Sequence, residues 1–177
     1  MAPRPRVTVG LAVPKGERAD WAVQKLTEVG VDRIVPLVAD RGVVRPDAER
    51  AGRLLARWRA VARSAAMQSR RLWLPEIGEP ESVRGMLAGT DRSVRHSSSP
   101  APALAEAGGA PPDLECPTIL VGPEGGWSEA ERSGATALVG LGPTVLRTET
   151  AAVVAGSLLV ALRSGVVAPV VVGARLA

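Results

Sequence analysis

No Phe and no Tyr occur in this sequence, and its only aromatic side chains are four Trp. Hydrophobic residues still make up 46% of the chain, so a core has to be built largely from Val, Leu and Ala. The shortage of rings leaves little surface on which nucleic-acid bases could stack, because such binding uses aromatic side chains. Trp73 and Trp127 are the candidates for stacking, and both are equally compatible with a place in the core.

Cysteine and histidine occur once each, as Cys116 and His96. A single cysteine excludes an internal disulfide and a Cys-rich metal site, and it favours a reducing compartment. We interpret His96 as a polar surface residue and expect no metal.

Long apolar segments are also missing. The first residues, MAPRPR, lack the apolar core of a signal peptide. The longest apolar run, residues 151–162, is too short to span a bilayer and predicts a buried helix. We therefore expect a soluble cytoplasmic protein with no membrane association.

The charge balance is mildly basic. Lys and Arg total 22 against 18 acidic residues, which gives a net charge of +4. This excess is compatible with a polyanionic partner but would also fit proteins that have none. The length, 177 residues, suits one domain with its own core.

Apolar strands alternate with helical patterns along the chain. We predict strands at 6–13, 34–38, 91–96, 118–122 and 145–147, and helices at 17–29, 47–70, 81–88, 128–139 and 149–162. Because the strands are apolar throughout and do not alternate with polar residues, they indicate a parallel sheet covered on both faces. The predicted fold class is therefore α/β, with a mostly parallel sheet and helices on both faces.

Several local signals refine these elements. Gly30 should stop the first helix, and Pro36 suggests a bulge or an edge in the second strand. Ser128 and Glu131 have the spacing of a capping box. The Ala-, Pro-, Gly- and Ser-rich stretch 97–117 predicts a mobile surface loop with at most one helical turn.

The long helix is expected to bury one face and to present arginines on another. Its predicted inner face is Leu54, Trp58, Val61, Ala65 and Gln68. Residues 50–71 contain seven arginines and no acid, and several lie four apart on one side. Such a strip suits an RNA backbone, although it is also compatible with an ordinary solvated face.

The segment ILVGPEGGWSEAE, residues 119–131, joins a strand directly to a helix through Gly122-Pro123-Glu124-Gly125-Gly126. In parallel sheets ligands lie beyond the carboxyl ends of the strands, and glycines let the backbone approach them closely. A plain tight turn is the alternative interpretation. The pattern is neither GxGxxG nor a phosphate loop, so nucleotide phosphate binding is poorly supported.

A second polar cluster, LGPTVLRTETA at 141–151, precedes the most apolar helix. Arg147 and Glu149 next to a buried helix need partners or a solvated pocket, because an unpaired buried charge is costly. The alternative is a helix cap with a neighbouring ion pair.

GPEGG and LRTETA, together with KLTEVGVDRIVPL and ARSAAMQSRRLWLPEI, resemble the RsmE-type 16S ribosomal RNA uridine-N3 methyltransferases of the SPOUT superfamily. The resemblance extends over about residues 13–162. It implies a deep trefoil knot near the carboxyl end and S-adenosylmethionine held by the knot loops. It also implies a homodimer, with ribosomal RNA or the small ribosomal subunit as partner.

The resemblance also implies roles for individual residues. The cofactor would be bound by Val121, Gly122, Pro123, Glu124, Gly125, Gly126, Leu141, Gly142, Leu146, Thr150 and Ala151. Arg147 would stabilise the anion that develops on uridine, and Glu149 would either orient Arg147 or take the proton. Gln68 and Arg71 would lie near the uridine. Arg53, Arg57, Arg63 and Arg70 would contact RNA.

Members of this family usually carry an amino-terminal RNA-binding barrel of the PUA type. Since the first predicted strand lies almost at residue 1, we expect residues 1–177 to be the SPOUT domain without that barrel. Two alternatives stay open: a non-catalytic dimeric RNA-binding or assembly module, and a methyltransferase of the superfamily with another target, such as the ribose 2′-oxygen.

Overall fold

The computed structural model describes residues 3–14, 16–43, 47–89 and 101–168. In this part of the chain one sheet contains β1 (Thr8–Ala12), β2 (Arg33–Val38), β3 (Glu76–Ile77), β4 (Glu81–Ser82), β5 (Ala103–Ala110), β6 (Thr118–Val121) and β7 (Leu138–Val139). The strand order is β3-β2-β1-β6-β5-β7, with β4 also beside β2, and every pair is parallel. The predicted α/β fold class is confirmed.

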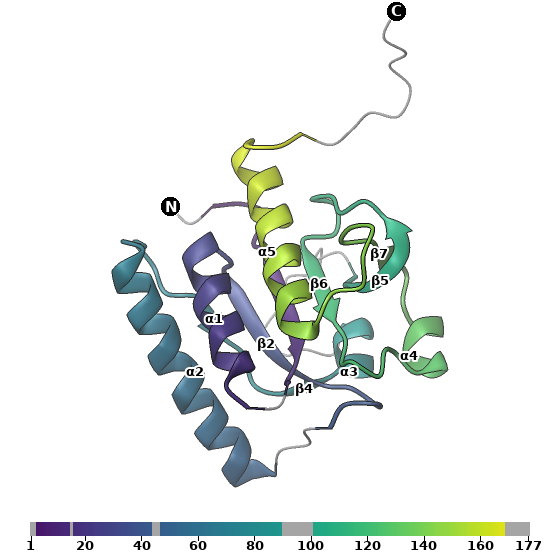
Figure 1. The fold of residues 1–177 in the computed structure, drawn as a ribbon, viewed down its shortest axis with the longest axis horizontal. Coiled ribbons are helices and arrows are strands. Elements are labelled where there is room, and N and C mark those ends of the chain that lie inside the picture. Colours follow the sequence, from purple (N-terminus) through teal and green to yellow (C-terminus); the bar gives the residue numbers. More distant parts are fainter. Residues whose placement is uncertain (1–2, 15, 44–46, 90–100, 169–177) are drawn as a thin grey trace, which may run out of the picture.

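The helices are α1 (Arg18–Val29), α2 (Ala48–Gln68), α3 (Val83–Leu87), α4 (Glu129–Ser133) and α5 (Thr148–Ser164). Figure 1 shows α1 between α2 and α5 on one face of the sheet. No helix within the described residues is both long and apolar enough to cross a membrane.

The core lies on both faces of the sheet because successive strand residues point to opposite sides. Val9 and Ile34 pack with Trp58 of α2 and Leu159 of α5 on the face that α1, α2 and α5 cover. On the other face, Val35 and Leu120 belong to a smaller cluster with Met86 of α3 and Trp127, as do Leu37 and Leu104. The site described below lies beside this second cluster.

Most elements with a strong local signal were predicted within a few residues. These are the strands predicted at 6–13, 34–38 and 118–122 and the helices predicted at 17–29, 47–70 and 149–162. Gly30 ends α1 at φ 106°, a conformation that glycine adopts readily. The capping box of Ser128 and Glu131 is present at the start of α4.

The prediction for Pro36 was wrong. β2 is an inner strand, with β1 on one side and both β3 and β4 on the other. β3 pairs with Arg33 and Ile34, and β4 pairs with Leu37 and Val38, so neither short strand pairs with Pro36. The proline, which has no N–H, is therefore accommodated where the neighbouring strand is interrupted.

The loop predicted at 97–117 was wrong over 103–110, which form β5, whereas 101–102 and 111–117 belong to no helix or strand. Ala103 and Leu104 are completely buried and pair with Ile119 and Leu120 of β6. Small residues carry no strand propensity, so packing between β6 and β7 decides their conformation. The predicted strand at 91–96, His96 and residues 97–100 lie outside the described residues.

Three further predictions differ from the structure near the carboxyl end and in α2. The helix predicted at 128–139 ends at Ser133, and Leu138–Val139 form β7, which pairs with β5. No strand forms at 145–147. The buried face of α2 is Leu55, Trp58, Ala62, Ala65 and Ala66, so Gln68 is exposed and Leu54 and Val61 are half-buried.

Close packing of α5 on α1 requires a glycine. A Cβ atom at Gly156 would lie 2.7 Å from Leu26 Cδ2 and 2.7 Å from Val31 Cγ2. Both neighbours are completely buried, and a valine side chain is stiff, so neither can easily move away.

We predict that Gly156→Ala lowers the free energy of unfolding by about 1–3 kcal/mol, through overpacking. Gly52→Ala in α2 is the matched control, because a Cβ atom there meets nothing within 4 Å. It should stabilise the protein by about 0.5–1 kcal/mol, since alanine favours the helix. Urea unfolding of both variants checks this prediction. If the free energy of unfolding changed in the same direction in both variants, overpacking at Gly156 would be contradicted.

Candidate functional site

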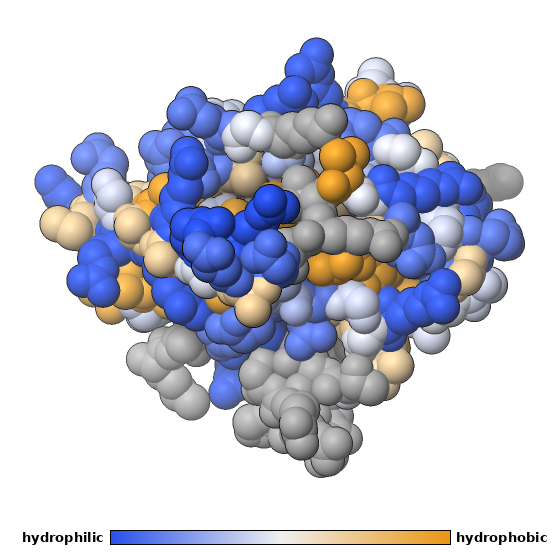
Figure 2. Space-filling view, turned by 90° about the horizontal axis from the view of Figure 1, so that it is seen from below, coloured by the Kyte–Doolittle hydropathy of each residue, from blue (hydrophilic) through white to orange (hydrophobic). Residues whose placement is uncertain are grey.

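A pocket of about 320 Å³ lies at the carboxyl end of β6 and beside residues 105–107 of β5. The loop after β6 and the segment 141–146 form two of its walls, and the first turn of α5 contributes Thr148 and Ala151. Figure 2 looks at the molecule from the side on which β1 leads into α1, and this face is mostly hydrophilic with small groups of apolar side chains. The position agrees with the rule that ligands bind beyond the carboxyl ends of parallel strands.

Most of the predicted cofactor-binding residues come together in this pocket. Those that line it are Val121, Gly122, Pro123, Glu124, Gly126, Leu141, Gly142, Leu146 and Ala151. Gly125 and Thr150 do not line it. Gly125 instead accepts a hydrogen bond of 3.2 Å through its carbonyl oxygen from Nη1 of Arg41.

The local geometry of the loop requires glycine at two positions. A Cβ atom at Gly122 would lie 3.0–3.2 Å from the ring of Trp127, so a side chain there would displace the indole. Gly126 adopts φ 68°, a conformation that other residues rarely adopt. The loop therefore folds tightly because Trp127 packs against it.

Trp127 itself joins the loop to β5. The side chain is buried, and its Nε1 donates a hydrogen bond of 3.0 Å to the carbonyl oxygen of Ala105. At the opposite wall, Thr148 Oγ1 donates to the carbonyl oxygen of Gly122 at 3.0 Å. These two bonds fix the start of α5 and the strand β5 to the same loop.

A buried carboxylate connects the loop to the end of β2. Glu131 is 1% exposed, and it accepts hydrogen bonds of 2.8 Å from the backbone N–H groups of Asp40 and Ser128. Ser128 Oγ also donates to Asp40 Oδ2 at 2.6 Å. The neighbour of Asp40, Arg41, lines the pocket, so Glu131 positions one wall of the site.

Sequence reasoning missed several lining residues. They are Arg41, Ala105, Glu106, Ala107, Arg132, Thr144, Val145 and Thr148, and Trp127 was considered only for stacking or the core. The β5 residues were missed because their segment was interpreted as a loop. Arg132 pairs with Glu106 at 2.8 Å across the pocket edge, a contact that sequence spacing does not reveal.

The two predicted catalytic residues at the start of α5 have very different surroundings. Arg147 is the N-cap residue and is exposed. The side chain of Glu149 is only 10% exposed, and its Oε2 is buried without a hydrogen-bond partner. Glu149 Oε1 lies 3.8 Å from Nη1 of Arg18 in α1, and no ion pair links it to Arg147 among the described residues.

Gln68 and Arg71 do not line the pocket. Gln68 is exposed at the end of α2. Arg71 is largely buried and donates to the carbonyl oxygens of Thr27 and Val31 at 2.9 and 2.8 Å. Burial lowers the pKa of Arg71 from its ordinary value, and the Asp32 carboxylate partly opposes that effect. Arg71 thus connects the end of α2 to the end of α1.

The arginine strip on α2 is partly neutralised. Arg53 pairs with Glu49 of the same helix, and Arg57 pairs with Asp20 of α1. For Arg63 and Arg70, both exposed, the structure has no ion pair within the residues it describes. Among the predicted RNA-binding residues these two carry the charges most available to a phosphate.

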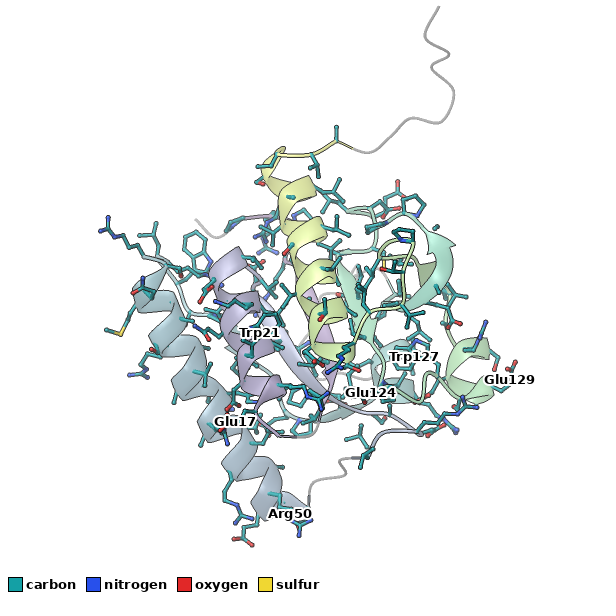
Figure 3. All side chains as sticks on the ribbon, viewed as in Figure 1. Glu17, Trp21, Arg50, Glu124, Trp127 and Glu129 are labelled. Atoms are coloured by element: carbon teal, nitrogen blue, oxygen red, sulfur yellow. The ribbon has the colours of Figure 1, made fainter. Side chains whose placement is uncertain are left out.

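We predict that Glu131→Gln lowers the free energy of unfolding by about 1.5–3 kcal/mol, because an amide group cannot accept both hydrogen bonds. Glu129→Gln, two residues earlier in α4, is the matched control. Glu129 is exposed and points away from the pocket (Figure 3). Loss of its negative charge should therefore lower the free energy of unfolding by less than about 1 kcal/mol. Chemical denaturation of both variants checks this prediction. An equal loss of unfolding free energy in the two variants would contradict a stabilising role of the buried carboxylate.

Comparison with known proteins gives concordant results. The profile of the family described as RNA methyltransferase domain matches residues 2–160. The chain is 39% identical over 168 residues to ribosomal RNA small subunit methyltransferase E of Mycobacterium tuberculosis, covering 86% of this chain and 62% of that protein. It is 34% identical over 163 residues to the Bacillus subtilis protein of the same name, covering 82% and 62%. The resemblance to RsmE-type enzymes is thereby confirmed.

Solved structures agree with this fold. Ribosomal RNA small subunit methyltransferase E from Neisseria gonorrhoeae, bound to S-adenosyl methionine, superposes with a TM-score of 0.73 at 28% identity, covering 93% of this chain and 68% of that one. The SpoU methyltransferase AviRb from Streptomyces viridochromogenes gives 0.58 at 16% identity, covering 90% and 61%, which shows a common fold. The chain spans about three-fifths of the length of the two relatives named above, 62% in each case.

Proposed function

Because the chain belongs to the RNA methyltransferase domain family, we propose that it is an S-adenosylmethionine-dependent methyltransferase of small-subunit ribosomal RNA, acting on uridine N3. The observation that carries the proposal is the pocket formed by the glycine-rich loop and the segment 141–146. The relatives that match most of this chain are named ribosomal RNA small subunit methyltransferase E, which supports the reaction class and the RNA. We place this activity in the cytoplasm.

The residues of the pocket fit the methyl donor. Its volume, about 320 Å³, falls within the range of small-molecule sites, about 300–1,000 Å³. Val121, Leu141 and Leu146 offer apolar walls for an adenine ring. Glu124 and Arg41 offer opposite charges for the ammonium and carboxylate groups of a methionine moiety.

When bound, S-adenosylmethionine supplies a methyl group already activated on a sulfonium. The protein therefore has to hold uridine N3 in line with that methyl group and to accept the N3 proton. Arg147, exposed at the first turn of α5, is proposed to stabilise the negative charge that develops on the uracil ring. Glu124 brings a negative charge to the wall of the pocket.

Of the two roles considered for Glu149, we propose proton acceptance. Orienting Arg147 would require a contact between the two side chains, and the described ion pairs place Glu149 with Arg18 instead. Glu149 Oε2 is buried and has no hydrogen-bond partner, so it keeps a lone pair for a proton. Because Glu149 does not line the pocket, its side chain would have to turn toward the bound uridine to take that proton. Gln68 and Arg71 lie at the end of α2, outside the pocket, so we propose that they approach the uridine bound by the partner chain of the homodimer.

RNA would be held mainly by arginines. Arg63 and Arg70 are exposed and supply charge for phosphate contacts, whereas Arg53 and Arg57 would first have to exchange an existing ion pair. We also propose a homodimer and a knotted carboxyl-terminal segment. The half-buried apolar residues of α5, such as Val154 and Leu158, support the dimer. The knot is proposed from the family to which the chain belongs.

We predict that the purified chain binds S-adenosylmethionine in calorimetry and that Ala151→Leu weakens binding at least tenfold, about 1.4 kcal/mol. The larger side chain would fill part of the pocket wall at the first turn of α5. Ala56→Leu, on an exposed position of α2, controls for the added apolar surface and should leave the Kd unchanged. A folded wild-type chain that binds no donor would favour the non-catalytic RNA-binding module.

We predict that Glu149→Gln lowers kcat for methyl transfer to small ribosomal subunits by about 10²–10⁴-fold, since it removes the proton acceptor. The subunits used should lack N3-methyluridine. The donor's Kd should stay at the wild-type value, because Glu149 does not line the pocket. Glu129→Gln is the control. Full activity of Glu149→Gln would sink the proposed role of this carboxylate.

A further inference from the structure

Arg18 lies between two carboxylates that come from distant parts of the chain. Its Nη1 is 3.7 Å from Oε1 of Glu124, in the loop after β6, and 3.8 Å from Oε1 of Glu149, in α5. Figure 3 shows Glu124 beneath the start of α5, between α1 and Trp127. Three separate segments therefore meet at this guanidinium, beside the pocket.

Helix stability does not explain an arginine at this position. Arg18 is the first residue of α1, where the positive end of the helix dipole disfavours a cation. The N-cap residue, Glu17, makes no side-chain capping bond that would compensate. The two carboxylates are the interactions that favour a positive charge there.

The burial of Glu149 gives the contact its importance. The side chain is nine-tenths buried, and a buried carboxylate is costly unless a positive charge lies nearby. The start of α5 helps through its dipole, and Arg18 adds a full charge. At 3.8 Å this ion pair is longer than a hydrogen bond, so it leaves the lone pairs of Glu149 unoccupied.

Glu124 extends the cluster into the pocket. It lines the pocket wall, whereas Arg18 and Glu149 do not. The side chains of Arg18 and Glu124 are 47% and 53% exposed, so water weakens their attraction, and the pair alone would contribute little to stability. Its effect is geometric, since one cation ties a pocket residue to a buried residue of α5.

We propose that Arg18 is a positioning residue for methyl transfer, which orients Glu149 and couples it to Glu124 at the pocket wall. This inference rests on the proposed function. In the reaction, uridine N3 gives its proton to Glu149 and its electron pair to the methyl carbon, while the pair of the broken carbon–sulfur bond remains on sulfur. Arg18 keeps Glu124 as a partner when Glu149 becomes neutral.

The test compares Arg18→Met, Arg18→Lys and the control Lys25→Met. Lys25 belongs to the same helix and pairs with Glu28 of that helix at 2.7 Å. We expect Arg18→Met to lower kcat on N3-unmethylated small subunits by about 10–100-fold, through misplacement of Glu149. The KM for subunits and the donor's Kd in calorimetry should change little. Arg18→Lys should recover part of the loss, because it restores the charge without the planar guanidinium.

A double-mutant cycle separates positioning from a general structural effect. If Arg18 acts through Glu149, Arg18→Met should cost almost nothing further in kcat in the Glu149→Gln background. The same cycle in urea unfolding should show that the shift in the midpoint caused by Arg18→Met becomes smaller once Glu149 is neutral. Additive effects in both measurements overturn the inference. If Arg18→Met does not fold, Arg18→Lys and Arg18→Gln replace it.

The outcomes distinguish this inference from the function on which it rests. If the wild-type chain and Arg18→Met are both fully active while Glu149→Gln is inactive, the role of Arg18 is overturned and the proposed methyltransferase activity stands. A folded wild-type chain that binds no donor and transfers no methyl group overturns the proposed function and the positioning role together.

Discussion

The site depends on one buried carboxylate. Glu131 accepts hydrogen bonds from the backbone of Asp40, at the end of β2, and of Ser128, at the end of the glycine-rich loop. A carboxylate removed from water has to be satisfied in this way, and once it is, the two segments can hardly separate. Arg41 and Glu124, which face the pocket from these two segments, thereby acquire fixed positions relative to each other.

Two further hydrogen bonds extend this constraint around the pocket. Trp127 donates to Ala105 of β5, and Thr148 donates to Gly122, so the strand on one side and the first turn of α5 on the other are both joined to the loop. Glycine at 122 allows the indole to pack against the backbone. The result is a pocket whose walls come from distant segments but whose geometry is set by a few polar contacts.

A feature of the fold or of the pocket can be predicted from the sequence where residues close together in the chain cause it. The capping box of Ser128 and Glu131 and the glycine-rich loop are short-range patterns, and the structure places both beside the pocket. β5 was missed because Ala and Gly carry no strand signal and pair only through their neighbours. The contact of Arg18 with Glu149 joins residues far apart in the chain, so no spacing rule can reveal it. The buried face of α2 differs from the predicted one because Leu55, Ala62 and Ala66 are buried, whereas Leu54 and Val61 pack against the core only half-buried.

Methylation of uridine at N3 is the chemical event that the pocket and the residues around it are proposed to bring about. The most direct measurement incubates the full chain with S-adenosylmethionine carrying a labelled methyl group and with small ribosomal subunits that lack N3-methyluridine, and then identifies the labelled nucleoside after digestion of the RNA. Label in N3-methyluridine is the predicted result. Label in a 2′-O-methyl nucleoside would contradict the proposed target atom, and a chain that binds the donor but leaves the RNA unlabelled would contradict the proposed reaction.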